Sequence, residues 1–268
     1  MISIQEMRSR QRLKKYDSYL CHTSHPITFQ YEFPNIEEKQ TYYQQLGLVG
    51  KGSMGDERYI FLLMDWVNRN IPHDGYSDFD GIANAVNVYK QMKDIKTGVN
   101  CKNVAIVMRD VLLLMGYYAR YIICMPFNED YEECHVVNIV YLPKMKKWIF
   151  IDPTMNAYIM NEEREILSID EIRSSLSTGK KLLVSDTLKW NGQSYDADEY
   201  LSYLAKNMFR FACTATSNWA TDMGESSIYV GLVPAGYSST GPLNSLFTID
   251  GKKFYKTTDS VFFWTPPI

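Results

Sequence analysis

The strongest periodic pattern in the chain lies between residues 101 and 115. Apolar side chains recur there at the i, i+3 and i+4 spacing of one helical stripe: Val104, Val107, Met108, Val111, Leu112 and Met115. Asn100 is a residue type that favours the N-cap position, and Gly116 is suited to end a helix. The pattern therefore predicts a helix over residues 101–115 with one buried face.

Upstream of this segment, residues 1–96 have a mainly helical pattern. One predicted helix is capped by Asp56, ends near Pro72 and turns four side chains inward: Tyr59, Ile60, Leu63 and Val67. A second predicted helix covers residues 82–92. The glycines of segment 50–55 match the letters of a dinucleotide-binding motif, but no strand precedes them and no acidic partner follows. That segment is therefore predicted to be a loop.

Downstream of residue 116 the pattern changes to strands. Three runs rich in β-branched and aromatic residues follow one another, separated by turn residues: 118–125, 135–142 and 148–152. One more helix is predicted between a capping box at Ser168 and Glu171 and a stop at Gly179. Beyond Trp190, strand-like runs return at 209–216, 227–233 and 260–264. Helices first and strands later predict an α+β architecture.

The length and composition are consistent with a sizeable buried core. The chain has 268 residues, of which 46% are hydrophobic and 14% aromatic. We predict an N-terminal helical segment over residues 1–57, a core over 58–188 and a strand-rich extension over 189–268. The extension either enlarges the main sheet or forms a small subdomain of its own.

Charge and cysteine content narrow the classes of partner. The 28 basic and 31 acidic residues nearly cancel, which does not predict a nucleic-acid partner. The first thirty residues contain no signal-peptide pattern, and no run approaches the ~20 apolar residues of a membrane span.

Five cysteines at irregular spacing predict free thiols and a cytoplasmic location. The four histidines do not pair with them at zinc-finger spacing, so a structural zinc site is not predicted.

The cysteine at the start of the predicted helix carries the first chemical hypothesis. Cys101 follows the N-cap residue Asn100, so a thiolate there faces unpaired backbone N–H groups and the positive end of the helix dipole. Both favour the charged form, and the thiol is expected to ionise more easily than a free one. The structural alternative is a small apolar side chain that fills space, because cysteine is among the most buried residue types.

A partner base for this thiol is expected at His135, in the predicted strand 135–142. The connection from Pro143 to Lys146 suits a four-residue loop, since proline fits the second position of a type I turn. Such a loop would pair Leu142 with Lys147. The structural alternative for His135 is a core histidine with its hydrogen bonds satisfied.

The same register brings a carboxylate near the histidine. It sets Val137 opposite Asp152, so His135 and Asp152 become diagonal neighbours on one face, on the order of 7 Å apart at the backbone. A carboxylate beside an imidazole orients the ring and stabilises its protonated form. If this face meets the start of the 101–115 helix, Cys101, His135 and Asp152 form a catalytic triad. The alternative for Asp152 is a turn residue ahead of Pro153.

The ordered set of residues from Gly98 to Thr154 resembles the core of the transglutaminase-like superfamily, relatives of papain-type cysteine proteases. The shared positions, in order, are Gly98, Cys101, Ala105, Gly116, Ala119-Arg120, His135 and Asp152-Pro153-Thr154. The upstream segment WVNRNIP, residues 66–72, resembles the helix that usually precedes this core. The likeness extends over roughly residues 58–160. Two departures are the extra residue Asn100 after the glycine pair and Val137, where an aromatic residue is common.

The resemblance implies a set of roles for these residues. Cys101 would be the nucleophile, His135 the general base and acid, and Asp152 the orienting carboxylate. The backbone N–H of Cys101 is the one oxyanion donor that we predict. The resemblance also implies a nucleophile helix packed on an antiparallel sheet, as in papain-like folds, with neither a metal nor an organic cofactor.

Three functions remain open from the sequence. The leading one is cysteine-dependent acyl transfer on amide bonds of peptides or proteins through a thioester, with hydrolysis favoured over transglutamination because nothing marks a protected second-substrate tunnel. The second is a non-catalytic binding or scaffold module that uses aromatic residues of the C-terminal extension: Tyr195, Tyr200, Tyr203, Tyr229, Tyr237 and Trp264. The third is a redox or metal site on Cys101, Cys124 and Cys134, which strand alternation disfavours because it would turn Cys134 away from His135.

Overall fold

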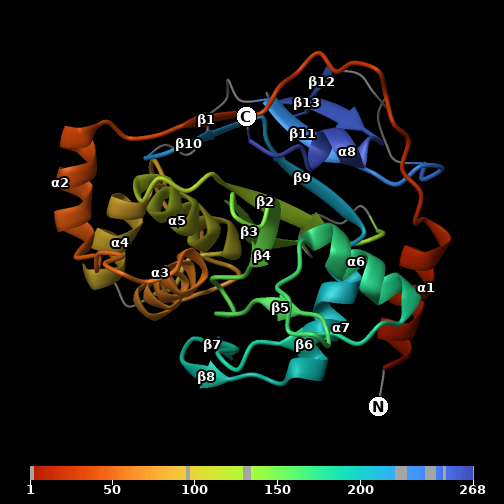
Figure 1. Cartoon of the computed structure of the whole chain (residues 1–268), viewed down its shortest axis with the longest axis horizontal. Coiled ribbons are helices and arrows are strands. Elements are labelled where there is room, and N and C mark those ends of the chain that lie inside the picture. Colours follow the sequence, from red (N-terminus) through yellow and green to blue (C-terminus); the bar gives the residue numbers. More distant parts are fainter. Residues whose placement is uncertain are drawn as a thin grey trace.

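A seven-stranded sheet runs through the middle of the molecule (Figure 1). The computed structural model describes residues 3–94, 97–128, 134–220, 228–238, 246–249 and 252–267. The strand order is β12-β13-β11-β9-β2-β3-β4, and only β11 and β13 are parallel neighbours. The strands are β2 (Ala119–Met125), β3 (His135–Leu142), β4 (Lys147–Ile151), β9 (Arg210–Thr214), β11 (Ile228–Leu232), β12 (Leu246–Ile249) and β13 (Lys252–Thr257). The predicted α+β class is confirmed, with an antiparallel core.

Eight helices in the described part of the chain cover the two faces of this sheet. They are α1 (Ile4–Lys15), α2 (Ile36–Leu46), α3 (Asp56–Asn70), α4 (Ala85–Asp94), α5 (Cys101–Leu114), α6 (Ile169–Thr178), α7 (Ala197–Asn207) and α8 (Ser260–Phe263). Figure 1 shows α2 to α5 grouped on one side of β2–β4 and α1, α6 and α7 on the other. None of these helices combines the length and the apolar character needed to cross a lipid bilayer.

The alternation of side chains in β3 divides the interior into two cores. Val137 and Ile139 point into a core shared with α6 and α7, which we call the α7-side core. Val136 and Val140 point into a core shared with α3, α4 and α5, which we call the α5-side core. The central strands are therefore buried on both faces.

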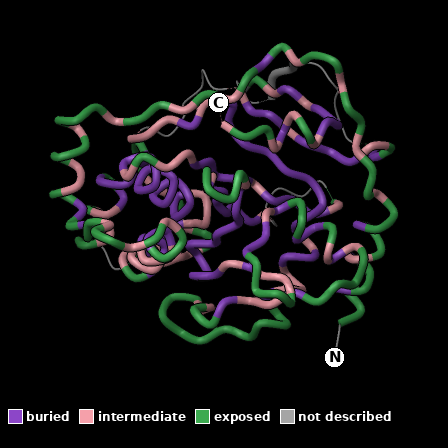
Figure 2. Tube along the Cα trace, in the orientation of Figure 1, coloured by how far each residue is buried: buried purple, intermediate pink, exposed green. Residues whose placement is uncertain are grey.

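Helix α5 is buried on more than the one face that its sequence pattern predicted. Every residue from Asn103 to Leu114 is buried, and Figure 2 shows the helix as one of the longest buried segments. The reason is that β2 and β3 pack on one side of α5 while α3 and α4 pack on the other. Periodicity detects the most apolar stripe of such a helix but not the second layer of helices that covers it.

Most local predictions for helix ends are confirmed. Ser168 and Glu171 form the predicted capping box of α6, and Gly179 ends that helix in the left-handed conformation. Asp56, however, is not the cap of α3. Gly55 occupies that position, and the Asp56 carboxylate instead accepts hydrogen bonds from Lys51 and from the Tyr117 hydroxyl.

The predicted register of β3 and β4 is confirmed. Leu142 pairs with Lys147, and the ladder continues to Asn138 opposite Ile151. The loop between the strands is closed by a hydrogen bond from the Met145 N–H to the Leu142 carbonyl. This register carries His135 and the residue after Ile151 to the same end of the sheet.

Three short strand pairs lie outside the main sheet in the part of the chain that the structure describes. They are β1 (Gln30–Glu32) with β10 (Thr216–Asn218), β5 (Ile159–Met160) with β6 (Leu183–Val184), and β7 (Lys189–Trp190) with β8 (Gln193–Ser194). The predicted domain boundaries after residues 57 and 188 remain predictions. In the main sheet, β9 from the C-terminal segment pairs directly with β2.

Candidate active site

Cys101 is the first residue of α5, as predicted. The Asn100 side chain caps the helix by accepting a hydrogen bond of 3.1 Å from the Asn103 N–H. The Cys101 side chain is partly buried and lines an open cavity. Burial raises the pKa of its thiol, but hydrogen bonds with the side chains of His135 and His73, the charge of His135 and a backbone hydrogen bond from Val136 lower that pKa to about 6. The thiol is therefore disposed to be a thiolate at neutral pH.

His135 and Asp152 are in direct contact. His135 Nε2 lies 2.7 Å from Asp152 Oδ2, and both side chains are almost completely buried. Burial lowers the pKa of the imidazole, but the charge of Asp152 and hydrogen bonds with Asp152 and Cys101 raise it well above its usual value. The two shifts together favour a thiolate beside an imidazolium, with the Asp152 carboxylate behind the ring.

Two further contacts hold the Asp152 carboxylate, and two more hold its backbone. Its Oδ2 accepts a hydrogen bond of 2.8 Å from the Tyr200 hydroxyl, and its Oδ1 accepts one of 3.1 Å from the Met155 N–H. The backbone of Asp152 exchanges two hydrogen bonds with Ala157. Asp152 therefore also forms the turn that the alternative interpretation predicted, and the turn is what aims its carboxylate at His135.

The three residues meet at the end of the sheet rather than beneath α5. His135 and Asp152 lie on the α7 side, where Tyr200 contacts the carboxylate and the ring of Tyr203 packs edge-on against His135 at 5.2 Å. Helix α5 packs on the opposite face. Cys101 reaches the imidazole only because it is at the helix start and His135 is at the strand start.

A histidine that the sequence analysis did not identify also reaches the thiol. His73 hydrogen-bonds with the Cys101 side chain and contributes to its lowered pKa. Its segment is held by the chain just before Cys101, since the Val99 N–H donates to the Pro72 carbonyl and the Asp74 N–H donates to the Val99 carbonyl, each at 2.9 Å. The only sequence signal was its place directly after the segment WVNRNIP.

Gly98 permits this approach. A Cβ atom at position 98 would lie 2.7 Å from backbone atoms of Pro72, His73 and Asp74. Only glycine avoids that overlap, so Gly98 allows the His73 segment to pack beside Cys101. This is a physical reason for a glycine at the position that the family pattern contains.

The hairpin β7–β8 fixes the ring of His73. The indole Nε1–H of Trp190 donates to His73 Nδ1 at 3.0 Å. Because indole nitrogen is only a donor, Nδ1 must be the acceptor, and a neutral His73 ring carries its proton on Nε2. Asn191 binds the backbone of the same histidine twice, accepting from its N–H and donating to its carbonyl, each at 2.8 Å.

A cavity of about 410 Å³ opens in front of Cys101 and His135. Its wall includes His73, Thr154 and Met155 together with aromatic residues of the C-terminal segment. Of the six aromatic residues that the sequence marked as a recognition surface, Tyr195, Tyr200 and Tyr203 line this cavity. Tyr229 and Tyr237 are buried elsewhere, so the six do not form one surface.

Cys134 is closer to the site than strand alternation predicted. It precedes β3 instead of lying within it, and it lines the same cavity as Cys101 and His135. Cys124, the third cysteine of the redox hypothesis, is fully buried, and burial raises the pKa of its thiol above the usual range. Among the described residues, no group of three or more His, Cys, Asp or Glu side chains could hold a metal ion.

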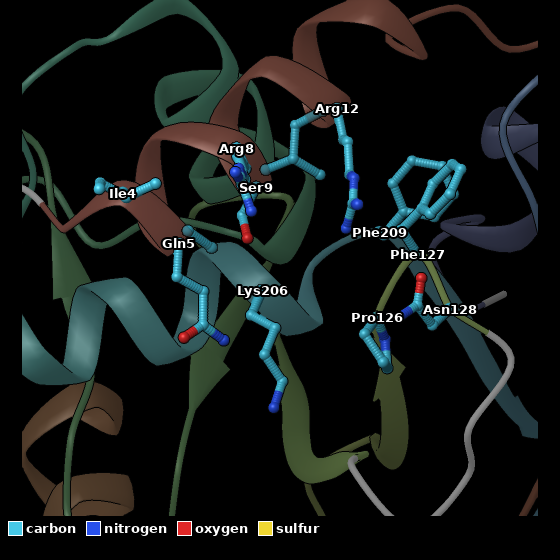
Figure 3. A pocket seen from close by; sticks show the side chains of 12 residues that line it. Ile4, Gln5, Arg8, Ser9, Arg12, Pro126, Phe127, Asn128, Lys206 and Phe209 are labelled. Atoms are coloured by element: carbon cyan, nitrogen blue, oxygen red, sulfur yellow. The ribbon is translucent and has the colours of Figure 1, made fainter.

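A second cavity, of about 430 Å³, lies between α1, α7 and the end of β2 (Figure 3). Arg8, Arg12 and Lys206 contribute to its wall, and the Arg12 guanidinium lies 4.6 Å from the centre of the Phe127 ring. None of the predicted site residues is among the described residues that line it. It is separate from the site around Cys101.

Residues 48–153 match the family described as the Transglutaminase-like superfamily. This range contains Cys101, His135 and Asp152 and ends before Trp190 and Tyr200. No curated protein matches the chain at a significant level.

Two solved structures are similar to part of the chain. One is named as a candidate cysteine protease from Cytophaga hutchinsonii, with 12% sequence identity and a TM-score of 0.32, covering 56% of this chain and 48% of that one. The other is calcium-bound LapG of Legionella pneumophila, with 15% identity and a TM-score of 0.32, covering 63% of this chain and 97% of that one. The match thus covers less than half the length of the Cytophaga hutchinsonii protein.

Proposed function

Residues 48–153 match the transglutaminase-like superfamily, and from that match we propose that the chain is a thiol enzyme acting on amide bonds of peptides or proteins. The observation that carries the proposal is the contact chain at the mouth of the cavity. Cys101 hydrogen-bonds with His135, whose Nε2 lies 2.7 Å from Asp152. A thiol with a pKa of about 6 beside a protonated imidazole is a nucleophile paired with its own proton donor.

The first step is attack of the Cys101 thiolate on the amide carbonyl carbon. A carbon–sulfur bond forms, and the carbonyl oxygen becomes an oxyanion that the Cys101 N–H and the His73 Nε2–H stabilise. Imidazolium His135 gives its proton to the amine nitrogen, the carbon–nitrogen bond breaks and a thioester remains. Asp152 and Tyr200 keep the ring of His135 in place.

The second step resolves the thioester. Neutral His135 takes a proton from water or from an amine while the oxygen or nitrogen of that molecule bonds to the thioester carbon. The carbon–sulfur bond then breaks, and the Cys101 thiolate is regenerated beside imidazolium. Water yields a carboxylic acid, as in a peptidase or amidase. An amine yields a new amide, as in a transglutaminase. We favour hydrolysis, because the sequence marks no protected tunnel for a second substrate.

Mapping of cysteine alkylation tests the activated nucleophile. At pH 7 we expect iodoacetamide to modify Cys101 before the exposed Cys21, which serves as an internal reference in the same molecule. Equal rates at the two cysteines would contradict the proposal. A screen with peptide electrophiles then tests the acyl-transfer chemistry, and labelling that survives Cys101→Ala would assign that chemistry to another residue.

The competing interpretation is a non-catalytic binding module. An occluded Cys101 sulfur, or a His135 imidazole that faces away from that sulfur, would favour this interpretation. Instead, Cys101 and His135 line one open cavity and hydrogen-bond with each other.

Trapping of acyl-enzyme with water and with a primary amine, measured in one reaction, would distinguish hydrolase from transferase.

A further inference from the structure

We propose that β7–β8 and α7 form a subsite beside Cys101 for an aromatic or large aliphatic side chain of the substrate. The proposal rests on the proposed function and specifies its substrate class. The substrates would be peptides that carry such a residue in the acyl portion next to the scissile amide. It is either the residue that supplies the attacked carbonyl or its N-terminal neighbour.

The wall that makes this subsite comes from a segment outside the family match. Trp190, Tyr195 and Tyr203 line the cavity together with Cys101. Trp190 and Tyr195 both line this open cavity, and their side chains remain 42% and 37% exposed. Large apolar surface left exposed in a concave site is typical of a binding surface, because a ligand that covers it removes that surface from water.

The wall is held in place by its turn and by its anchors. Asn191 and Gly192 both have positive φ angles, 47° and 79°, which a two-residue hairpin turn of type I′ requires. Trp190 and Asn191 bind His73, and the Lys189 ammonium lies 2.8 Å from Asp65 Oδ1 on α3. A ring fixed in this way loses little conformational freedom when a ligand packs against it.

The chemistry of the lining selects the kind of side chain. Apart from the Cys101–His135 pair itself and neutral His73, the described lining contains no Asp, Glu, Lys or Arg. A charged substrate side chain would lose its hydration there without gaining a counter-ion. The lining also has no Asn or Gln, so it lacks the carboxylate and amide groups that would pair with the hydroxyls of a sugar. Aromatic rings with a few hydroxyls fit an apolar side chain on a peptide.

Binding to a variant that cannot react tests the subsite without catalysis. We would measure the affinity of Cys101→Ala for capped dipeptide amides with Phe, Leu, Gly, Lys or Asp at either of the two positions. At one position, Phe and Leu are expected to bind at least tenfold more tightly than Lys and Asp. Equal affinities for all five side chains at both positions would overturn the proposal of an apolar subsite. Tighter binding of a neutral oligosaccharide would also overturn it.

The wild-type protein gives the second readout. With matching peptidyl acyloxymethyl ketones, inactivation through Cys101 is expected to follow the same order of side chains. Tyr195→Ala should reduce the preference for Phe over Lys at least fivefold. Phe33→Ala is the matched control, because Phe33 is 38% exposed and packs on Tyr118, in a part of the structure that does not line the cavity. An unchanged preference in Tyr195→Ala would count against the subsite.

The two proposals fail separately. If Cys101 reacts quickly with iodoacetamide but the peptide series shows no side-chain preference, the subsite is wrong and the thiol enzyme stands. If Cys101 reacts as slowly as Cys21 while Cys101→Ala keeps the preference for Phe, the enzyme proposal is wrong and the cavity is a peptide-binding site.

Discussion

At the scale of single residues, the thiol of Cys101 has a measurable signature. Its pKa of about 6 is depressed, so the thiolate persists above that pH and is lost as the pH falls through 6. We expect the alkylation rate to rise with a midpoint near pH 6, whereas an ordinary thiol has a midpoint of about 8.5. The rate of iodoacetamide labelling between pH 4.5 and 9.5 measures this midpoint. A midpoint near that of Cys21 would refute the assignment of Cys101 as an activated nucleophile.

His135→Ala tests the cause of that shift. The substitution removes the hydrogen bond and the positive charge of His135. The burial that raises the thiol pKa remains, together with the hydrogen bonds from His73 and Val136 that lower it. We expect the midpoint to move upward by more than one pH unit and the rate at pH 7 to fall about tenfold, since the gain in intrinsic nucleophilicity offsets part of the lost thiolate. A shift of the same size in Phe33→Ala would show that the effect is not local.

Tyr200→Phe removes a single hydroxyl from the support of Asp152. The lost hydrogen bond of 2.8 Å leaves a buried carboxylate oxygen with fewer donors, and we expect the free energy of unfolding to fall by about 1–2 kcal/mol. The rate of inactivation by a peptidyl electrophile should fall several-fold, because the carboxylate that orients His135 is less firmly held.

The control for this substitution is Tyr237→Phe. It removes a hydroxyl that donates to the Phe127 carbonyl at 2.7 Å, far along the chain from Asp152. Denaturant unfolding should show a comparable loss of stability for the two variants, but only Tyr200→Phe should slow the reaction of Cys101. Equal rates would mean that Tyr200 has no role beyond packing.

At the scale of elements, Gly98 controls how closely two segments approach. Gly98→Ala places a Cβ atom 2.7 Å from three backbone atoms, which cannot move aside as a flexible side chain would. We expect a loss of about 1–3 kcal/mol in stability and a raised midpoint of Cys101 alkylation, because His73 is displaced from the thiol.

Gly231→Ala is the matched control for Gly98→Ala. Its added Cβ would meet only the Phe211 carbonyl oxygen at 3.9 Å, an ordinary contact. Thermal unfolding reports the loss of stability, and the pH profile of alkylation reports the change in the Cys101 midpoint. If Gly98→Ala leaves the alkylation midpoint at that of the unmodified protein, the contact between His73 and the Cys101 thiol does not depend on this close approach.

The elements also show which features the sequence could predict. The helix at Cys101, the capping box of α6 and the β3–β4 register depend on residues within a few positions of one another, and all are confirmed. Trp190 and Tyr200 reach the site through tertiary packing across long stretches of chain. Local patterns do not encode such contacts, and the α7 face that bears His135 and Asp152 was not predictable for the same reason.

At the scale of the whole molecule, the site needs both layers of helices. Cys101 comes from the α5-side layer and Tyr200 from the α7-side layer, and the sheet end between them provides His135 and Asp152. The N-terminal segment is tied to the far end of the chain as well. The Leu20 N–H donates to the Thr258 carbonyl at 2.8 Å, and β1 pairs with β10. The layers are therefore mutually dependent.

A fragment that ends at residue 188 tests this dependence and the predicted domain boundary. Its β2 would lose β9, and its α7-side core would lack Tyr200, Leu204 and Phe211, so the side chains that these residues cover would be exposed to water. Several buried side chains of this size contribute an amount comparable to the roughly 5–15 kcal/mol by which a domain is usually stable. We expect residues 1–188 alone to show no cooperative thermal transition and a Cys101 that reacts like Cys21. Addition of residues 189–268 should restore both the transition and the fast reaction. If the fragment melts cooperatively by itself and keeps its alkylation midpoint near pH 6, the segment after 188 is an appended extension, and the two-layer support of the site by α7 is wrong.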